Sequence, residues 1–218
     1  MNPKDFVNQL KQQNDSQLWR LKSQEACPRE NEKMNVKSLL KMALKNEIEA
    51  AELAAFWIST TAEIDVKLGL ARQSGDEAKH YRLIEERLRE LGEDLTNFSP
   101  LTQGYSPLFQ FLKTLEGTVE RVAAGQFTRE AIALIKNEQF IEFCKSIGDQ
   151  KTARLYSEII QPDETFHHEL GRKILEKYAV TEDLQKRAGS ASEKTLELAE
   201  ELQGLLLTKT GIHHAPGC

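Results

Sequence analysis

Two copies of one short motif hold the residues of this chain whose types and spacing are best suited to chemistry. Residues 76–80 read D-E-A-K-H and residues 163–167 read D-E-T-F-H, so both follow the pattern D-E-x-x-H. On an α-helix, residues three apart project from the same face, and each copy therefore offers a carboxylate and an imidazole to a common point. Two such helices facing each other would supply much of a di-metal site inside a helical bundle.

A di-metal site also needs single carboxylates from two further helices. Glu47 interrupts the apolar stripe of a helix predicted over residues 36–61, and Glu138 does the same in a helix predicted over residues 128–147. We therefore predict that six side chains from four helices bind the metals, namely Glu47, Glu77, His80, Glu138, Glu164 and His167.

Other glutamates in the same two helices remain alternatives for the single positions. Glu49 sits four residues after Lys45, a pairing typical of the solvated flank of a helix, which favours Glu47 as the ligand. The open alternatives are Glu49 or Glu52 in place of Glu47, and Glu142 or Glu130 in place of Glu138.

The charges of this ligand set indicate which metals it would hold. Burying an unpaired carboxylate costs several kcal/mol, so four buried glutamates need compensating charge. Two divalent cations would balance them, with the two histidines as neutral nitrogen donors. Mixed carboxylate and imidazole ligation favours two iron ions, with manganese or a mixed manganese–iron pair as the alternative. We predict that Asp76 and Asp163, which precede the ligand glutamates, orient the histidines or hold their ring N–H groups.

A single E-x-x-H on a solvated helix is common and usually has no function. Here both copies share the preceding aspartate, use two of the 5 histidines, and lie on predicted core stripes, so the joint pattern favours ligation.

His168 points elsewhere around its helix and is predicted to be a polar surface residue. A faint repeat accompanies the motifs, because L-K-N-E at residues 44–47 resembles I-K-N-E at residues 135–138.

The composition of the chain narrows its class. The 218 residues include 39% hydrophobic and 29% charged residues, which suits a helical domain with a solvated exterior. A net charge of −5, with acids and bases interspersed, argues against general binding of nucleic acid or anionic membranes. No apolar run approaches the roughly 20 residues that span a bilayer, and the polar N-terminus lacks a secretion signal. We therefore expect a cytoplasmic protein. Its scattered cysteines Cys27, Cys144 and Cys218 are predicted to be ordinary thiols.

The pattern of apolar residues and helix breakers predicts an all-α, four-helix bundle. Helices are expected over about residues 36–61, 63–91, 107–124 continuing to 147 after a break at Gly125, a fourth ending near 178, and a last one over 181–207. Residues 92–106 are rich in loop formers and are predicted to be a long crossover between the second and third helices. Gly75 and Pro162, two residues before each ligand glutamate, either distort their helices or simply begin helix segments.

The predicted organisation has three parts. Residues 1–34 form a loosely attached helical arm, residues 35–180 form the bundle, and residues 181–218 form a C-terminal helix and tail. The last helix is expected to pack outside the bundle or to form the contact of a homodimer. No role is assigned to His213, His214 or Cys218 in the tail.

The order Glu, Glu-x-x-His, Glu, Glu-x-x-His over residues 36–180 resembles the ferritin-like di-iron carboxylate superfamily, which includes ferritins, rubrerythrins and several oxygenases. The motif at residues 76–80 is similar to the D-E-x-R-H of the oxygenase branch, with Lys79 in place of arginine. E-I-E-A at residues 47–50 resembles the first ligand motif of aldehyde-deformylating oxygenases, and the run 125–138 is spaced as in their third helix. The resemblance implies a ferritin-like bundle with Glu47 and Glu138 as ligands.

Three functions fit these features. The first is a di-iron oxidoreductase that activates dioxygen or peroxide to oxidise a small organic substrate, with electrons from a separate donor protein, since no flavin, nicotinamide or iron–sulfur motif is visible. The second is a ferritin- or rubrerythrin-like protein that oxidises iron or scavenges peroxide, although the rubredoxin cysteines are missing. The third is a non-catalytic helical interaction module.

Overall fold

The fold is described by a computed structural model that covers residues 1–23, 35–210 and 215–217. Every regular element in these ranges is helical, which confirms the predicted all-α class. None of the helices within these ranges combines the length and apolarity needed to cross a membrane. The elements are α1 (Pro3–Ser23), α2 (Val36–Thr60), α3 (Ile64–Glu90), α4 (Pro107–Lys113), α5 (Thr118–Val122), the π-helical turn η1 (Ala123–Arg129), α6 (Glu130–Ser146), α7 (Gln150–Leu155), the π-helical turn η2 (Tyr156–Ile160), α8 (Gln161–Tyr178) and α9 (Glu182–Thr210).

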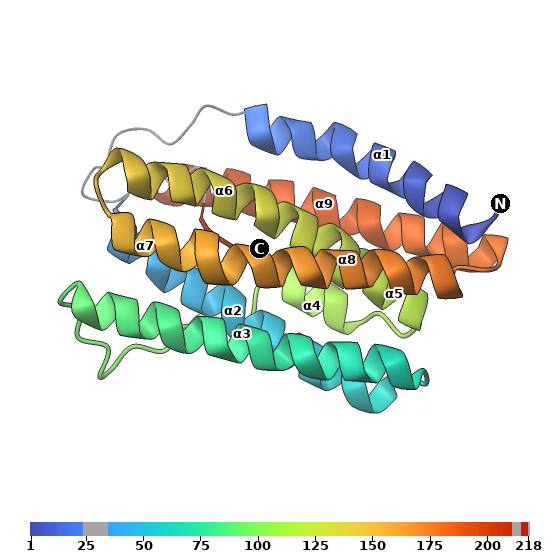
Figure 1. Ribbon diagram of the computed structural model, residues 1–218, viewed down its shortest axis with the longest axis horizontal. Helices are drawn as coiled ribbons and strands as arrows, with labels where there is room; N and C mark the ends of the chain where they lie inside the picture. Colours follow the sequence, from blue (N-terminus) through green and yellow to red (C-terminus); the bar gives the residue numbers. More distant parts are fainter. Residues whose placement is uncertain (24–34, 211–214, 218) are drawn as a thin grey trace.

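Four long helices form the centre of the molecule. Helix α2 packs along α3, α6 packs against α8, and α3 also meets α8. Figure 1 shows that α2 and α8 run in one direction while α3 and α6 run in the other. Because α3 and α6 are parallel, residues 91–117 between them must travel back along the bundle, and they include α4.

Two apolar layers enclose a polar layer at mid-height. Leu40 and Leu44 of α2 belong to one apolar layer, and Leu53 and Trp57 of the same helix belong to the other. Helix α3 repeats this order, since Leu70 lies in the second layer and Ile84 in the first, with acidic and histidine residues between them. This sequence pattern places the polar side chains deep inside the bundle, where apolar packing on both sides excludes water.

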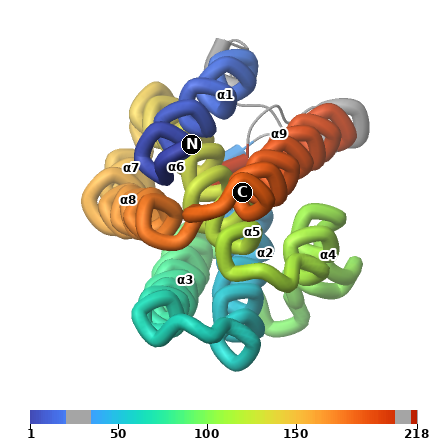
Figure 2. Tube along the Cα trace, turned by 90° about the vertical axis from the view of Figure 1, so that its right-hand side faces the viewer, coloured from blue at the N-terminus to red at the C-terminus, as the bar shows by residue number. Residues whose placement is uncertain are grey.

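The flanking helices pack on the core, which corrects the expectation of a loosely attached arm, whereas α9 packs outside the four central helices, against α1, α4, α5 and η1. Phe6 and Leu10 of α1 and Ala188 of α9 are buried in the same apolar layer as Trp57. Figure 2 shows α1 and α9 on the side of the molecule opposite α2 and α3. The boundaries drawn at residues 34/35 and 180/181 stay a prediction.

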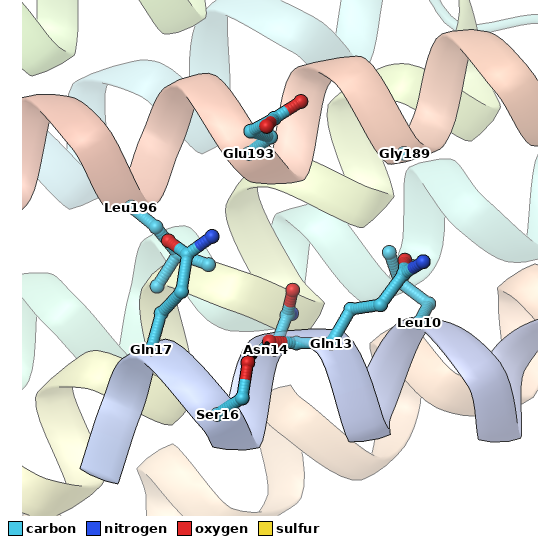
Figure 3. A pocket seen from close by; sticks show the side chains of 8 residues that line it. All are labelled: Leu10, Gln13, Asn14, Ser16, Gln17, Gly189, Glu193 and Leu196. Carbon is cyan, nitrogen blue, oxygen red and sulfur yellow. Dashed lines mark hydrogen bonds between the residues drawn. The ribbon is translucent and has the colours of Figure 1, made fainter. Parts of the chain in front are cut away.

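A polar groove of about 400 Å³ separates α1 from α9. Gln13 and Gln17 of α1 and Glu193 of α9 line it (Figure 3), and no predicted ligand does. Below it, Asn14 donates to the Thr128 hydroxyl at 2.9 Å, and that hydroxyl lies 2.8 Å from the hydroxyl of Ser192 in α9. Buried polar contacts between helices therefore hold α1 and α9 to η1 at this point.

Helix ends were predicted well where a local cap decides them. The Asn35 side chain accepts from the backbone N–H of Ser38 at 2.9 Å at the start of α2, and Gly92 follows α3 with φ of 84°. The break predicted at Gly125 is wrong, because the helical chain is interrupted at residues 114–117 and then continues from Thr118 to Ser146 through η1. Gly125 instead packs closely, since a Cβ there would lie 2.9 Å from the Trp57 ring.

The two predicted helix distortions have different outcomes. Gly75 lies within the uninterrupted α-helix α3, so it neither interrupts the α-helical pattern nor begins a helix segment, and both alternatives left open by the sequence are wrong there. Pro162 lies in the first turn of α8, directly after the π-helical turn η2, so the second copy of the motif does follow a local widening of the helix. Proline is tolerated there because its missing N–H falls where the regular hydrogen-bond ladder restarts.

Glu49 is buried, which corrects its interpretation as a solvated residue. Its carboxylate accepts from the backbone N–H of Ser106 at 2.7 Å and from the Ser106 hydroxyl at 2.6 Å. That hydroxyl also accepts from the N–H of Phe109 in the first turn of α4. Glu49 therefore ties the end of the crossover to α2.

The close contact of α8 with η1 makes Gly171 a sensitive position. A Cβ on Gly171 would lie 2.8 Å from the backbone carbon of Gln126 and 2.9 Å from the backbone nitrogen of Phe127. We expect Gly171→Ala to lower the free energy of unfolding by about 1–3 kcal/mol, because backbone on both sides must shift. Urea denaturation followed by circular dichroism measures this. Gly189→Ala on α9 is the control, since its Cβ would meet nothing within 4 Å; an equal loss in both variants would contradict the packing argument.

Candidate metal centre

Six side chains from four helices meet in the polar layer. All six residues are buried, with between 0 and 3% of their surface exposed. We call them the carboxylate–histidine cluster: Glu47 from α2, Glu77 and His80 from α3, Glu130 from α6, and Glu164 and His167 from α8.

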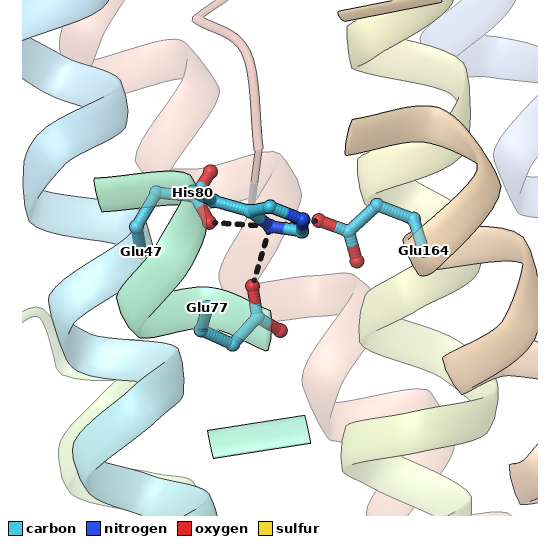
Figure 4. A group of neighbouring side chains, drawn as sticks. All are labelled: Glu47, Glu77, His80 and Glu164. Carbon is cyan, nitrogen blue, oxygen red and sulfur yellow. Dashed lines mark hydrogen bonds and ion pairs between the residues drawn. The ribbon is translucent and has the colours of Figure 1, made fainter. Parts of the chain in front are cut away.

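The cluster contains two overlapping groups of possible ligands. In each group the ligand atoms all lie within 4.8 Å of one another. The first group is Glu47, Glu77, His80 and Glu164 (Figure 4), and the second is Glu77, Glu130, Glu164 and His167. Each group has three carboxylates and one imidazole. Glu77 and Glu164 belong to both groups, so each could contribute to two neighbouring cation positions.

The structure places Glu130, not Glu138, in the cluster. Glu130 is 2% exposed, whereas Glu138 lies on the exposed side of α6. The inward residue two turns after Glu130 is Asn137, which is fully buried, and its neighbour Glu138 is rotated about 100° away around the helix. Glu130 was among the alternatives left open by the sequence; Glu52 and Glu142 belong to neither group.

Both histidines direct Nδ1 into the cluster. His80 Nδ1 lies 3.3 Å from Glu47 Oε2 and 3.2 Å from Glu77 Oε2. His167 Nδ1 lies 3.5 Å from one oxygen of Glu77 and 3.5 Å from one of Glu164. The i, i+3 spacing of each motif produces this convergence, as its local geometry predicts.

Each aspartate contacts the histidine of the other motif. Asp163 Oδ2 lies 3.1 Å from His80 Nε2, and Asp76 Oδ2 lies 3.2 Å from His167 Nε2. When the imidazole is neutral and its one proton on Nε2 is donated to the aspartate, the lone pair of Nδ1 is left for a cation in the cluster. Lys79 in turn donates to Asp163 at 2.6 Å, which keeps that carboxylate ionised.

Removing one aspartate tests this arrangement. We expect Asp163→Ala to weaken divalent-metal binding by about 10–100-fold, because His80 loses the partner that fixes its ring and its proton. Competition with a chelator measures the affinity. Asp183→Ala on α9 is the control, since that aspartate side chain is 77% exposed. Equal affinities for the two variants would show that His80 needs no such partner.

Three further polar residues beside the cluster were not predicted. Gln73 Nε2 donates to Glu130 Oε1 at 2.7 Å, and Gln126 Nε2 donates to Gln73 Oε1 at 2.7 Å. Arg129 Nη1 lies 3.6 Å from the same Glu130 oxygen. Gln73 has a sequence signal, since it precedes Glu77 by one helical turn on the same face. Gln126 and Arg129 lie in η1, whose geometry no local pattern indicated.

The titration behaviour of the cluster reflects crowded buried carboxylates. Burial raises the pKa of Glu47 to about 7, although a hydrogen bond from His80 acts in the opposite direction. Burial also raises the pKa of Glu164 well above its usual range, with the charge of Glu77 adding to the effect. For Glu77, burial is outweighed by the hydrogen bond from His80 and the charges of the histidines, so its pKa falls to about 2. Without cations, protons must therefore neutralise part of the cluster.

The donor set fits a pair of divalent cations. Glu164 Oε2 and His167 Nδ1 are buried 3.5 Å apart, and neither has a hydrogen-bond partner among the described residues. Buried polar atoms without partners are rare, and a cation within the ring of carboxylates would supply the partner that these two atoms lack. Oxygen and imidazole donors without thiolates suit iron or manganese.

The fold and the cluster define an all-α protein with a buried carboxylate–histidine site on four helices. Residues 4–202 match the model of the family described as protein of unknown function (DUF455), and the chain belongs to this family. The match extends from α1 through most of α9, in agreement with their shared core. Searches of curated proteins and of solved structures found no match.

Proposed function

We propose that this chain is a ferritin-like di-metal carboxylate protein that holds two iron ions, or manganese in one or both positions. The observation that carries the proposal is the pair of overlapping ligand groups with Glu77 and Glu164 in common. The parallel course of α3 and α6, joined by a long crossover, supports the ferritin-like arrangement.

The proposed activity is that of an oxidoreductase acting on a small organic substrate. A bound pair of redox-active metals supplies the reduction of dioxygen or peroxide. The four glutamates would neutralise the cations, and Asp76 and Asp163 would hold the Nε2 protons so that each imidazole binds through Nδ1. The apolar layers on both sides would keep water from the cluster. Electrons would come from a separate donor protein.

Metal loading followed by oxygen uptake tests the proposal. The chain is loaded anaerobically with ferrous iron, desalted and analysed, and dioxygen consumption is then followed with an electrode in the presence of a chemical reductant. We expect two iron ions per chain and reductant-dependent oxygen uptake in the wild type. Glu138→Ala, at an exposed position of α6, should behave as the wild type, while Glu77→Ala should lose both properties. Equal iron in wild type and Glu77→Ala would contradict the proposal.

The same experiment separates the other functions. Oxidation of ferrous iron far beyond the two bound ions, with no need of a reductant, would indicate a ferritin-like iron-oxidising protein. Rapid consumption of peroxide in place of dioxygen would indicate a peroxide scavenger. A chain that folds and binds no metal would indicate an interaction module.

A further inference from the structure

A short segment near the end of the chain lies inside the bundle. Residues 215–217 are all buried, and they lie between α2 and α6. Asn46 Nδ2 of α2 donates to the carbonyl oxygen of Pro216 at 2.9 Å, and the N–H of Gly217 donates to Asn137 Oδ1 of α6 at 2.8 Å. The carbonyl and the N–H belong to one peptide group, so Asn46 and Asn137 bind the same amide from opposite sides. We call this pair of contacts the clamp. In Figure 1 this segment is the short red stretch in the middle of the molecule.

The segment lies beside the carboxylate–histidine cluster. Asn46 immediately precedes Glu47, and its backbone oxygen accepts from Arg129 Nη2 at 3.3 Å. Arg129 also lies 3.6 Å from Glu130. Asn46 therefore adjoins Glu47 in the chain and is linked through Arg129 to Glu130, the glutamate that α6 contributes to the cluster. Asn137 comes two turns after Glu130 on the buried face of α6. Residues 215–217 therefore lie between α2 and α6, bound next to Glu47 on one side and two helical turns from Glu130 on the other.

The repeated K-N-E sequence acquires a meaning from this contact. Its glutamates do not share a role, because Glu47 is buried in the cluster and Glu138 is exposed. Its asparagines do, since Asn46 and Asn137 bind the two ends of the same amide. The K-N-E repeat, which suggested paired ligands in the sequence, therefore contains the two asparagines that form the clamp.

The clamp favours glycine at position 217, and its two described hydrogen bonds join neutral groups. Gly217 has φ of 75°, which favours glycine, and a Cβ on it would lie 3.2 Å from the Cβ of Asn46. A side chain at this position would therefore oppose docking. Within residues 215–217, alanine, proline and glycine offer little apolar surface, and the described hydrogen bonds are the two neutral ones to Asn46 and Asn137.

We propose that residues 215–217 are a gate over the carboxylate–histidine cluster. Latched by Asn46 and Asn137, the segment closes the space between α2 and α6, and its release opens that space to reactants. The gating role rests on the proposed function, because it regulates access to the same site.

Release of bound iron tests the gate. The variants are Gly217→Val and a deletion of residues 215–218, with Gly189→Ala as the control at a position with open space around it. Each is loaded with ferrous iron, and iron loss to a bulky chelator is timed. We expect both gate variants to lose iron at least about tenfold faster than wild type and control, because the latch hydrogen bonds are lost, with unchanged iron content and helicity. Rates equal to those of the control would overturn the gate.

A second readout needs no metal. Cys144 is fully buried in the same apolar layer as Ala215, so its reaction with a small thiol reagent reports access to this space. With Cys27→Ser in all variants, and Cys218→Ser wherever that residue is present, we expect faster labelling of Cys144 in both gate variants. If no iron binds, the proposed function fails, and labelling alone decides on the gate: faster labelling supports it, and labelling at the control rate overturns it. If iron binds, iron release decides.

Discussion

Glu164→Ala is expected to abolish binding of both metal ions, whereas Glu47→Ala and Glu130→Ala are each expected to leave one. Glu164 belongs to both ligand groups, while Glu47 and Glu130 each belong to one. Removing a shared carboxylate leaves both positions with uncompensated charge and one oxygen ligand fewer. Removing an unshared one leaves the other group of four side chains complete. Metal analysis of the purified, iron-loaded variants measures the difference directly.

Glu138→Ala is the matched control for these variants. It changes the same residue type on α6, but at an exposed position, so both ions should remain. A loss of metal in Glu138→Ala comparable with that in Glu130→Ala would restore the assignment made from the sequence and contradict the structural one. Circular dichroism of each metal-free variant separates lost ligation from lost folding.

The members of the cluster that the sequence identified are those whose convergence depends on helix geometry alone. Glu77 with His80, and Glu164 with His167, converge because residues three apart share a helix face, whatever surrounds the helix. Glu47 could be recognised because α2 is a regular helix with a clear apolar stripe. The helical class can be predicted from the same periodicity.

Glu130 could not be chosen from periodicity because its helix is not regular upstream. The π-helical turn η1 ends at Arg129, immediately before it, and such a turn inserts extra residues into the helical repeat and rotates the residues C-terminal to it. The stripe that selected Glu138 lay within α6 itself, one residue out of register with the buried positions Ala133, Asn137 and Phe140. The K-N-E repeat strengthened the error, because its resemblance reflects the asparagines and not the glutamates.

Contacts between distant parts of the chain account for the other differences. Glu49 was expected to be solvated because Lys45 precedes it by one turn. The Lys45 ammonium does lie 3.8 Å from it, but Glu49 is buried because its carboxylate also binds Ser106, 57 residues away. Asn46 binds Pro216 over a separation of 170 residues. The exchange of aspartates between the two motifs is likewise visible only once α3 and α8 face each other. Local rules carry no information on such pairs.

The metal-free chain is expected to lose stability as pH rises from 5 to 8, whereas the stabilisation conferred by bound metal is expected to grow over the same interval. Burial raises the pKa of Glu47 from 4.5 to about 7 in the folded chain. A raised folded-state pKa contributes stability that is fully present below pH 4.5 and is lost as pH rises through 7. A difference of this size corresponds to about 3 kcal/mol for one group.

Three other groups of the cluster, Glu164, His80 and Glu77, have shifted pKa values, and none of them opposes this trend between pH 5 and 8. Burial raises the pKa of Glu164 as well, so its contribution also falls with rising pH. Burial opposes protonation of His80, but hydrogen bonds to Glu47 and Glu77 outweigh it and raise its pKa to about 11, so its contribution begins to fall above pH 6.5. Glu77, with a pKa of about 2, is ionised in both states above pH 5 and adds no slope.

Bound metal reverses the trend because ligands must release their protons to bind. Divalent cations replace the protons on the carboxylates, and affinity rises as proton competition falls. Stabilisation by a ligand grows with the ratio of its concentration to its dissociation constant, so the gap in free energy of unfolding between metal-loaded and metal-free chains should widen from pH 5 to 8.

Urea denaturation at several pH values, with chelator or with added ferrous iron under anaerobic conditions, measures both slopes. Glu47→Gln is the matched control, because it keeps the shape of the side chain and removes its titration; its metal-free slope should be flatter than that of the wild type. If the metal-free wild type kept a level or rising free energy of unfolding between pH 5 and 8, its buried carboxylates would not depend on protons for compensation. The charge argument that places two cations among them would then fail.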